Sequence, residues 1–177
     1  MTSRWVVVLT FGTALGCGLN AGVFFAFSSF VMKALARLSP AQGIAAMNSM
    51  NITAVTPLFM TALFGPGATC LLLAIVAVSA WHKPGAGYLF VGAAVYLTGA
   101  ILVTIVFNVP RNDALARVNP SDAEASRFWL EYVRSWTMWN HVRTVAALVS
   151  AALLTFALCG TQHGTIANLE PVTRTVR

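Results

Sequence analysis

Four long apolar runs constrain this chain more than any other feature of its sequence. They extend over Trp5–Val31, Thr56–Ala80, Gly85–Phe107 and Trp139–Cys159. A run of about 20 mostly apolar residues is long enough to cross the hydrocarbon core of a bilayer as a helix. The sequence therefore predicts an all-α membrane protein, a bundle of four transmembrane helices that has the lipid bilayer as a partner.

The composition agrees with this fold class. Hydrophobic residues make up 58% of the 177 residues and charged residues only 9%, whereas a soluble domain carries about 25% charged residues. We expect a single transmembrane domain over residues 1–160 and a polar, flexible tail over 161–177. The first apolar run is longer than the h-region of a signal peptide, about 7–15 residues, so it is expected to be a retained span. We expect a multi-pass protein that is located in the bacterial inner membrane.

The formal net charge of +6 comes from thinly spread Lys and Arg residues. No basic cluster resembles a nucleic-acid footprint, so nucleic acid is not an expected partner. Six Lys and Arg residues flank the spans on the side of the first and third connections, and four lie on the other side. The positive-inside rule then favours cytoplasmic first and third connections and external termini. The three cysteines lie within the runs without a CxxC pattern and are expected to be packing residues.

The connections between the runs differ in their helix signals. The stretch WHKPGAG at 81–87 predicts a tight turn. In the first connection, Ser39 as N-cap and Pro40 at the first helical position predict a short interfacial helix. Its apolar residues Ile44, Met47 and Met50 are expected to lie against the bundle.

The third connection is longer and more polar. Pro110 predicts an interruption of the third helix. Ser121 and Glu124 then predict a capping box at the start of an extended fourth helix. That helix is longer than the bilayer requires, so its first half is expected to stand outside the hydrocarbon.

Polar and helix-breaking residues inside the runs need partners, because lipid offers none. Asn20 is interpreted either as a hydrogen-bonding residue between helices, which we favour, or as a substrate contact. The sequence GPG at 65–67 predicts a break that frees backbone carbonyls. Two GxxxG spacings in the first run, which permit close helix contact, fall on Gly12, Gly16, Gly18 and Gly22.

The fourth helix carries the most informative spacing. One of its faces bears Tyr132, Trp136, Asn140 and Arg143 at helical intervals. Arg143 lies about one turn inside the apolar run, where a guanidinium either snorkels outward or pairs with an internal acceptor. His141 lies about 100° around the helix from Asn140.

The absence of carboxylates from the apolar cores disfavours several functions. Carboxylate-bridged di-iron chemistry and ion-coupled transport both need such groups. Haem held by two histidines is poorly supported, because His82 and His163 belong to the opposite side from His141. What remains is a cationic, amide-lined and aromatic mouth, which suits a planar or anionic organic ligand.

Four blocks of the sequence, FSSFVMKALARL, MNSMN, NVPRNDALA and WLEYVRSWTMWNHVRT, lie in this order between about Phe24 and Ala152. They contain the patterns N-x-P-x-N and W-x-x-Y-x-x-x-W-x-x-W-N-H-x-R, and Asn51 closes a Met-x-x-x-Asn stretch. Together the blocks resemble the anthrone oxygenase-like family of small integral membrane proteins. Lys33 stands where many members have proline. The matched positions are Asn108, Pro110, Asn112, Trp129, Tyr132, Trp136, Trp139, Asn140, His141 and Arg143.

The resemblance implies an oxygenase that converts an anthrone-type, lipophilic aromatic substrate to an anthraquinone without a cofactor or metal. Deprotonation of the anthrone methylene needs a base, for which a histidine suits, and this role falls on His141. Arg143 and Asn140 would stabilise the enolate oxygen. Substrate-binding positions carried over in the same way are Asn51, Asn108, Asn112, Tyr132, Trp136 and Trp139.

Two other functions stay open from the sequence. The chain could be a non-catalytic small-molecule binder or an accessory membrane protein. A metal-dependent enzyme that uses His141 is disfavoured, because no ligand cluster accompanies that residue.

Overall fold

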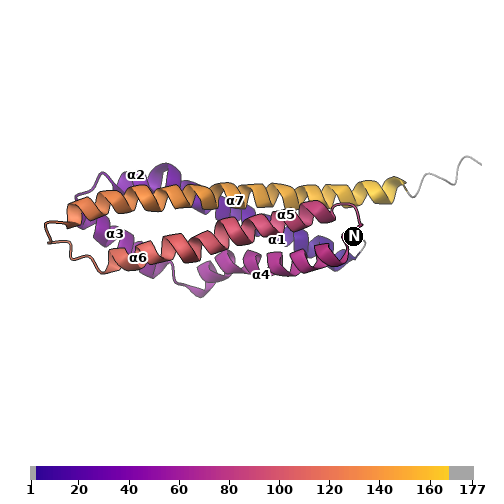
Figure 1. The fold of residues 1–177 in the computed structure, drawn as a ribbon, viewed down its shortest axis with the longest axis horizontal. Helices are drawn as coiled ribbons and strands as arrows, with labels where there is room; N and C mark the ends of the chain where they lie inside the picture. Colours follow the sequence, from indigo (N-terminus) through magenta and orange to yellow (C-terminus); the bar gives the residue numbers. More distant parts are fainter. Residues whose placement is uncertain (1–2, 168–177) are drawn as a thin grey trace, which may run out of the picture.

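The computed structural model describes residues 3–167, with side chains described as far as residue 160, and this part of the chain is an elongated helical bundle (Figure 1). Four of its helical stretches are long and apolar enough to cross a membrane, namely Arg4–Leu35, Pro57–Ser79, Ala86–Ala116 and Ala125–Gly160. The predicted all-α fold with four spans is thereby confirmed, and the protein is a multi-pass membrane protein.

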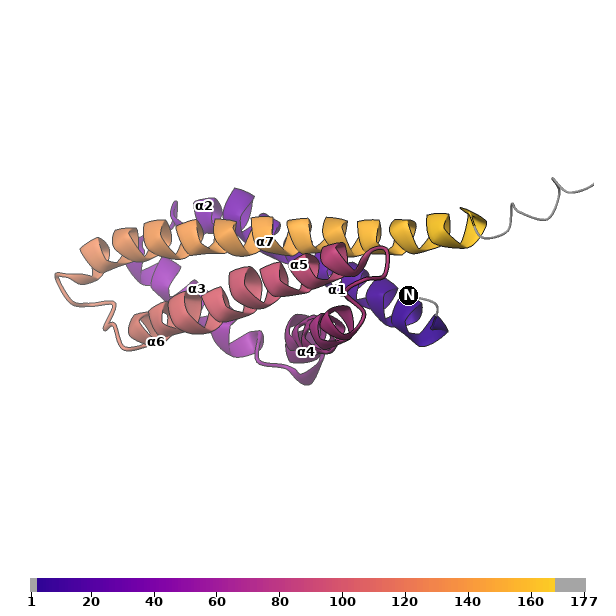
Figure 2. The same cartoon turned by 45° about the vertical axis from the view of Figure 1, so that its right-hand side comes forward.

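Two of the other spans pack directly against the last helix, and the remaining span packs on those two. The elements are α1 (Arg4–Ala26), the π-helical turn η1 (Phe27–Val31), α2 (Met32–Leu35), α3 (Pro40–Thr53), α4 (Pro57–Ser79), α5 (Ala86–Tyr96), the π-helical turns η2 (Leu97–Leu102) and η3 (Thr104–Asn108), α6 (Val109–Ala116) and α7 (Ala125–Ala167). Helices α1 and α5 pack along α7, and α4 packs on α1 and α5 (Figures 1 and 2). The start of α1 and the end of α7 lie at the same end of the bundle (Figure 1).

Helix α7 is longer than its span, as expected for an extended fourth helix. It continues to Ala167, so the first residues of the predicted tail are helical, and residues 168–177 lie outside the described part of the chain. The predicted capping box at its start is wrong. Helix α7 begins at Ala125, because a turn in which Asp122 Oδ1 accepts from Asn119 Nδ2 at 3.0 Å occupies the preceding residues.

Helix α3 forms as its cap signals predict. Ser39 is the N-cap, and Gln42 Oε1 accepts from the Ser39 amide at 3.3 Å and from the Ser39 hydroxyl at 2.8 Å. Ile44 and Met47 are buried. Gly43 lets α3 approach α7, since a Cβ at this position would lie 2.5 Å from the indole of Trp129.

Pro66 lies inside α4 without ending it. A proline lacks the amide that would bind the carbonyl four residues earlier, here that of Ala62. Asn20 of α1 supplies the missing donor, because its Nδ2 donates to Ala62 O at 2.8 Å. The same Nδ2 also donates to Tyr96 Oη at 2.9 Å. The Tyr96 hydroxyl in turn donates to Leu63 O at 3.0 Å. Asn20 is therefore the hydrogen-bonding residue between helices that the sequence favoured.

One other sequence-based expectation for the spans is wrong, and another holds at one glycine only. Pro110 does not interrupt the third helix: it lies in the first turn of α6, directly after η3, and the helix continues to Ala116. The GxxxG spacings produce one close approach rather than a continuous seam. A Cβ on Gly16 would lie 2.5 Å from the Pro66 ring, while Gly12, Gly18 and Gly22 have nothing within 4 Å.

Candidate functional site: a cationic cavity within the bundle

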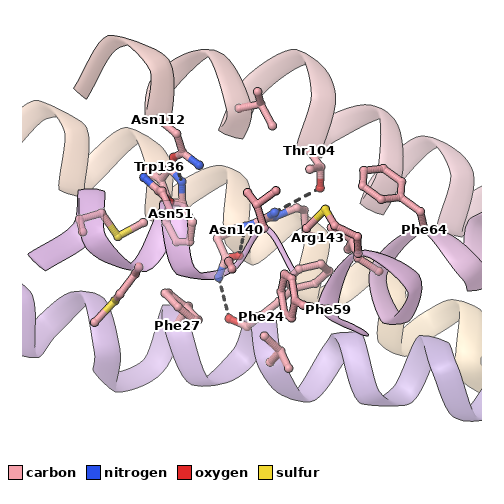
Figure 3. Close-up of a pocket in the computed structure, with 18 residues that line it drawn as sticks. Phe24, Phe27, Asn51, Phe59, Phe64, Thr104, Asn112, Trp136, Asn140 and Arg143 are labelled. Carbon is pink, nitrogen blue, oxygen red and sulfur yellow. Dashed lines mark hydrogen bonds between the residues drawn. The ribbon is translucent and has the colours of Figure 1, made fainter. Parts of the chain in front are cut away.

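A cavity of about 310 Å³ lies where α3 and the first turns of α4 meet α1, α6 and α7. This volume is at the lower end of the range of small-molecule sites, about 300–1,000 Å³. Its walls are mainly Phe, Met, Leu, Val and Trp side chains (Figure 3). Its five polar lining residues are Asn51, Thr104, Asn112, Asn140 and Arg143.

Arg143 is the only charged residue that lines this cavity in the described part of the chain, and it is only 6% exposed. Its Nη2 donates to Asn140 Oδ1 at 2.6 Å, and its Nη1 donates to Thr104 Oγ1 at 3.1 Å. The guanidinium therefore pairs with internal acceptors rather than snorkelling to the interface.

Two aromatic rings flank the same guanidinium. The Cζ atom of Arg143 lies 4.4 Å from the ring centroid of Phe24 and 5.2 Å from that of Trp136. Both distances are within the range of a cation–π contact. The Nε atom is buried and has no hydrogen-bond acceptor, so the donors of Arg143 are only partly used by the protein.

Asn140 fixes the position of Arg143 from the side of α1. Its Nδ2 donates to the Phe24 carbonyl and to Ser28 Oγ, each at 2.6 Å. Because the Asn140 amide nitrogen donates to these two groups, only the Asn140 oxygen remains for Arg143, from which it accepts. Ser28 belongs to η1 and Thr104 to η3, so both helices that face the pair carry a π-helical turn at that level. Such turns are frequent at functional sites.

Asn112 occupies the opposite wall of the cavity. Its Oδ1 accepts from Tyr132 Oη at 2.9 Å and from Trp136 Nε1 at 2.8 Å. Because the oxygen has two donors, the amide group of Asn112 is left for the cavity. Asn51 of α3 lies close by (Figure 3), and its Nδ2 is buried without an acceptor.

The structure brings together five of the residues that the sequence predicted for the site: Asn51, Asn112, Trp136, Asn140 and Arg143 line the cavity. Tyr132 lies behind the cavity wall that Asn112 forms, and its hydroxyl orients Asn112 by donating to it. Asn108 also lies behind the wall, and its Nδ2 donates to Trp136 O at 3.3 Å. Trp139 does not line the cavity; it stacks on Phe107, with ring centroids 3.5 Å apart.

His141 is not brought into this group. Its side chain is exposed and lines a separate notch on the outer face of α2 and α7. Among the described residues, no group of three or more His, Cys, Asp or Glu side chains is placed to hold a metal ion.

Three site residues were missed by sequence reasoning. Thr104 is one turn before Asn108, so extending the polar face of that helix backward would have found it. Phe24 and Ser28 follow Asn20 at intervals of four on one helix face. The spacing alone gives no reason to connect these two residues with the fourth span.

The fold and the cavity define a four-span integral membrane protein with an internal, cationic and aromatic-lined cavity between its spans and α3. The chain belongs to the anthrone oxygenase family, whose model matches residues 58–153, more than half of the chain. The matched segment includes Thr104, Asn112, Asn140 and Arg143, whereas the walls from α1 and α3 lie outside it. No curated protein and no solved structure matches the chain.

Proposed function

We propose that the cavity binds a planar, lipophilic aromatic as its enolate and that the protein is a cofactor-independent oxygenase of the anthrone type. One observation carries this proposal. Arg143 is a buried cation that lines an aromatic cavity, and none of the described residues that line the cavity with it is a carboxylate. An uncompensated buried charge is costly, so an anionic ligand oxygen against Arg143 would supply the missing partner.

The chemistry that this site supports is stabilisation of charge. Loss of a proton from the anthrone methylene places negative charge on the ketone oxygen, where Arg143 is already oriented by Asn140 and Thr104. Donors that are fixed before the reaction stabilise a developing oxyanion better than water does. The amide group of Asn112 and Nδ2 of Asn51 are further donors on the same cavity.

The electron-rich methylene carbon then forms a bond to dioxygen, giving a peroxide. The O–O bond breaks as the second methylene hydrogen leaves, and a new carbonyl forms. One anthrone and one dioxygen thus give one anthraquinone and one water. The described cavity walls contain no carboxylate and no imidazole. We therefore propose that water at the opening of the cavity accepts the first methylene proton. In this proposal, His141 does not contact the substrate.

The lack of a base in the described walls favours a second candidate, a non-catalytic binder of the same ligand class. The two functions differ in turnover. Detergent-purified protein supplied with anthrone and air should form anthraquinone, which is detected by absorbance, and should consume dioxygen. Binding of anthrone without either change would establish the binder instead.

The residue test is Arg143→Lys, with Arg111→Lys as its control. Lysine keeps the charge but loses the planar fork of donors, and losing one preorganised oxyanion donor costs about 10²–10³ in rate. Arg111 donates to Phe107 O and Ser135 Oγ and does not line the cavity, so Arg111→Lys should keep its turnover. Equal turnover in the folded Arg143→Lys protein would remove Arg143 from the site and with it this proposal.

A further inference from the structure

A second concave site lies on the outer face of the bundle, separate from the cavity. This notch, of about 430 Å³, lies between α2 and α7. Three basic side chains line it: Lys33 from α2, and Arg134 and His141 from α7. No acidic residue is among its described lining residues. The charge of these side chains favours an anion as the ligand of the notch.

Thr137 is a polar residue among those that line the notch. Its Oγ1 is buried and has no hydrogen-bond partner. A hydroxyl can donate to a phosphate oxygen, and a buried polar atom without a partner is uncommon in a folded protein. A residue that lines the notch thus carries a hydroxyl that the protein leaves without a partner.

The surface of α7 on either side of the notch indicates where the bilayer begins. Arg134, Met138, Val142 and Val145 follow one another at helical intervals on one stripe. Met138, Val142 and Val145 are 52%, 40% and 61% exposed, and the stripe is apolar from Met138 onward. A cation followed by exposed apolar residues is the pattern expected where headgroups give way to acyl chains.

We propose that the notch binds the phosphate of an anionic phospholipid. Lys33 and Arg134 hold the phosphate, the Thr137 hydroxyl donates to it, and one acyl chain lies along the apolar stripe of α7. Basic pockets between transmembrane helices bind the headgroups of anionic lipids for the same electrostatic reason. This proposal does not depend on the ligand of the internal cavity.

The test compares lipid binding by two double variants of the full chain in detergent. Lys33→Gln with Arg134→Gln removes both notch cations. The control, Arg4→Gln with Lys83→Gln, removes two cations near the other end of the bundle. Native mass spectrometry counts bound phosphatidylglycerol and phosphatidylcholine, and inorganic phosphate is titrated separately.

We expect the unmodified protein to prefer phosphatidylglycerol over phosphatidylcholine. Each surface cation contributes about fivefold to the binding of an anionic lipid, so loss of both notch cations should weaken phosphatidylglycerol binding about 25-fold. The control variant should bind as the unmodified protein does. Thr137→Val should weaken binding about tenfold, because it removes one hydrogen bond to a charged group and nearly keeps the side-chain shape.

Two results would overturn the proposal. An equal loss in the control variant would show that only net charge matters. Inorganic phosphate that binds through Lys33 and Arg134, without any preference between the two lipids, would assign the notch to free phosphate rather than to a phospholipid.

Discussion

The hydrogen bond from Asn20 to the carbonyl of Ala62 gives a sharp stability prediction. The carbonyl is free only because Pro66 lacks an amide hydrogen. Asn20→Ala therefore removes the donor and leaves this carbonyl unpaired. Hydrogen bonds between membrane helices contribute about 0.6 kcal/mol on average and up to about 1.7 kcal/mol, and an unpaired buried polar group costs about 1–3 kcal/mol. We expect Asn20→Ala to lower the free energy of unfolding by about 2 kcal/mol.

Pro66→Ala should relieve part of this cost. Alanine restores the amide that binds the Ala62 carbonyl within α4, so Asn20 then has less to compensate. In the Pro66→Ala background, the cost of Asn20→Ala should fall by about 1 kcal/mol, and this difference is the coupling energy of the double-mutant cycle. Equilibrium unfolding in mixed micelles of a mild detergent and dodecyl sulfate, followed by circular dichroism, measures all four proteins.

The control breaks a different hydrogen bond between the same two helices. Thr13 Oγ1 donates to Thr69 Oγ1 at 2.8 Å, and Thr13→Val removes this bond without touching the Ala62 carbonyl. Its cost should add to that of Pro66→Ala. An Asn20→Ala cost that is the same with Pro66 and with alanine at this position would refute the reasoning, because the freed carbonyl would then not be what Asn20 satisfies.

Four further predictions concern topology, chemistry, packing and metal. Tags at the two termini should be accessible from the same side of the membrane; opposite sides would contradict the four-span bundle. His141→Ala should keep anthrone turnover within about twofold, since catalytic acid–base groups contribute about 10²–10⁴ and this imidazole does not line the cavity; a loss of that size would restore His141 as the base. Gly99→Ala should destabilise the protein by about 1–3 kcal/mol, because its Cβ would overlap Ala146 of α7, whereas Gly18→Ala, with open space around it, should not. Purified active protein should hold no stoichiometric iron, copper or zinc by elemental analysis; activity lost to a chelator and restored by one metal would contradict the cofactor-free mechanism.

Three features could be predicted from the sequence: the spans, the interfacial helix and one wall of the site. Each depends on signals within a single segment of the chain. Hydropathy fixes the length of a span, Ser39 and Pro40 fix the start of α3, and spacing places Asn140 and Arg143 on one face of α7. These signals require only the geometry of a single helix.

What the sequence could not supply is the rotation of one helix relative to another. Thr104 and Phe24 meet Arg143 because the third and first spans present those faces inward, and the π-helical turns shift the register of each span close to that level. For His141, the spacing argument had already placed the ring about 100° away from Asn140. The family resemblance assigned it a catalytic role that the position of its side chain does not favour.

The place of Arg143 in the chain order has a consequence for biogenesis. A guanidinium at the centre of an isolated span costs about 2.5–3.5 kcal/mol on insertion into the bilayer. Synthesis proceeds from the N-terminus, and α7 is the last of the described helices. Phe24 and Thr104, which contact the guanidinium, belong to spans that leave the ribosome earlier. The span that carries the buried charge is thus delivered when its internal partners are already in the membrane, and the cost of that charge is offset as the span enters.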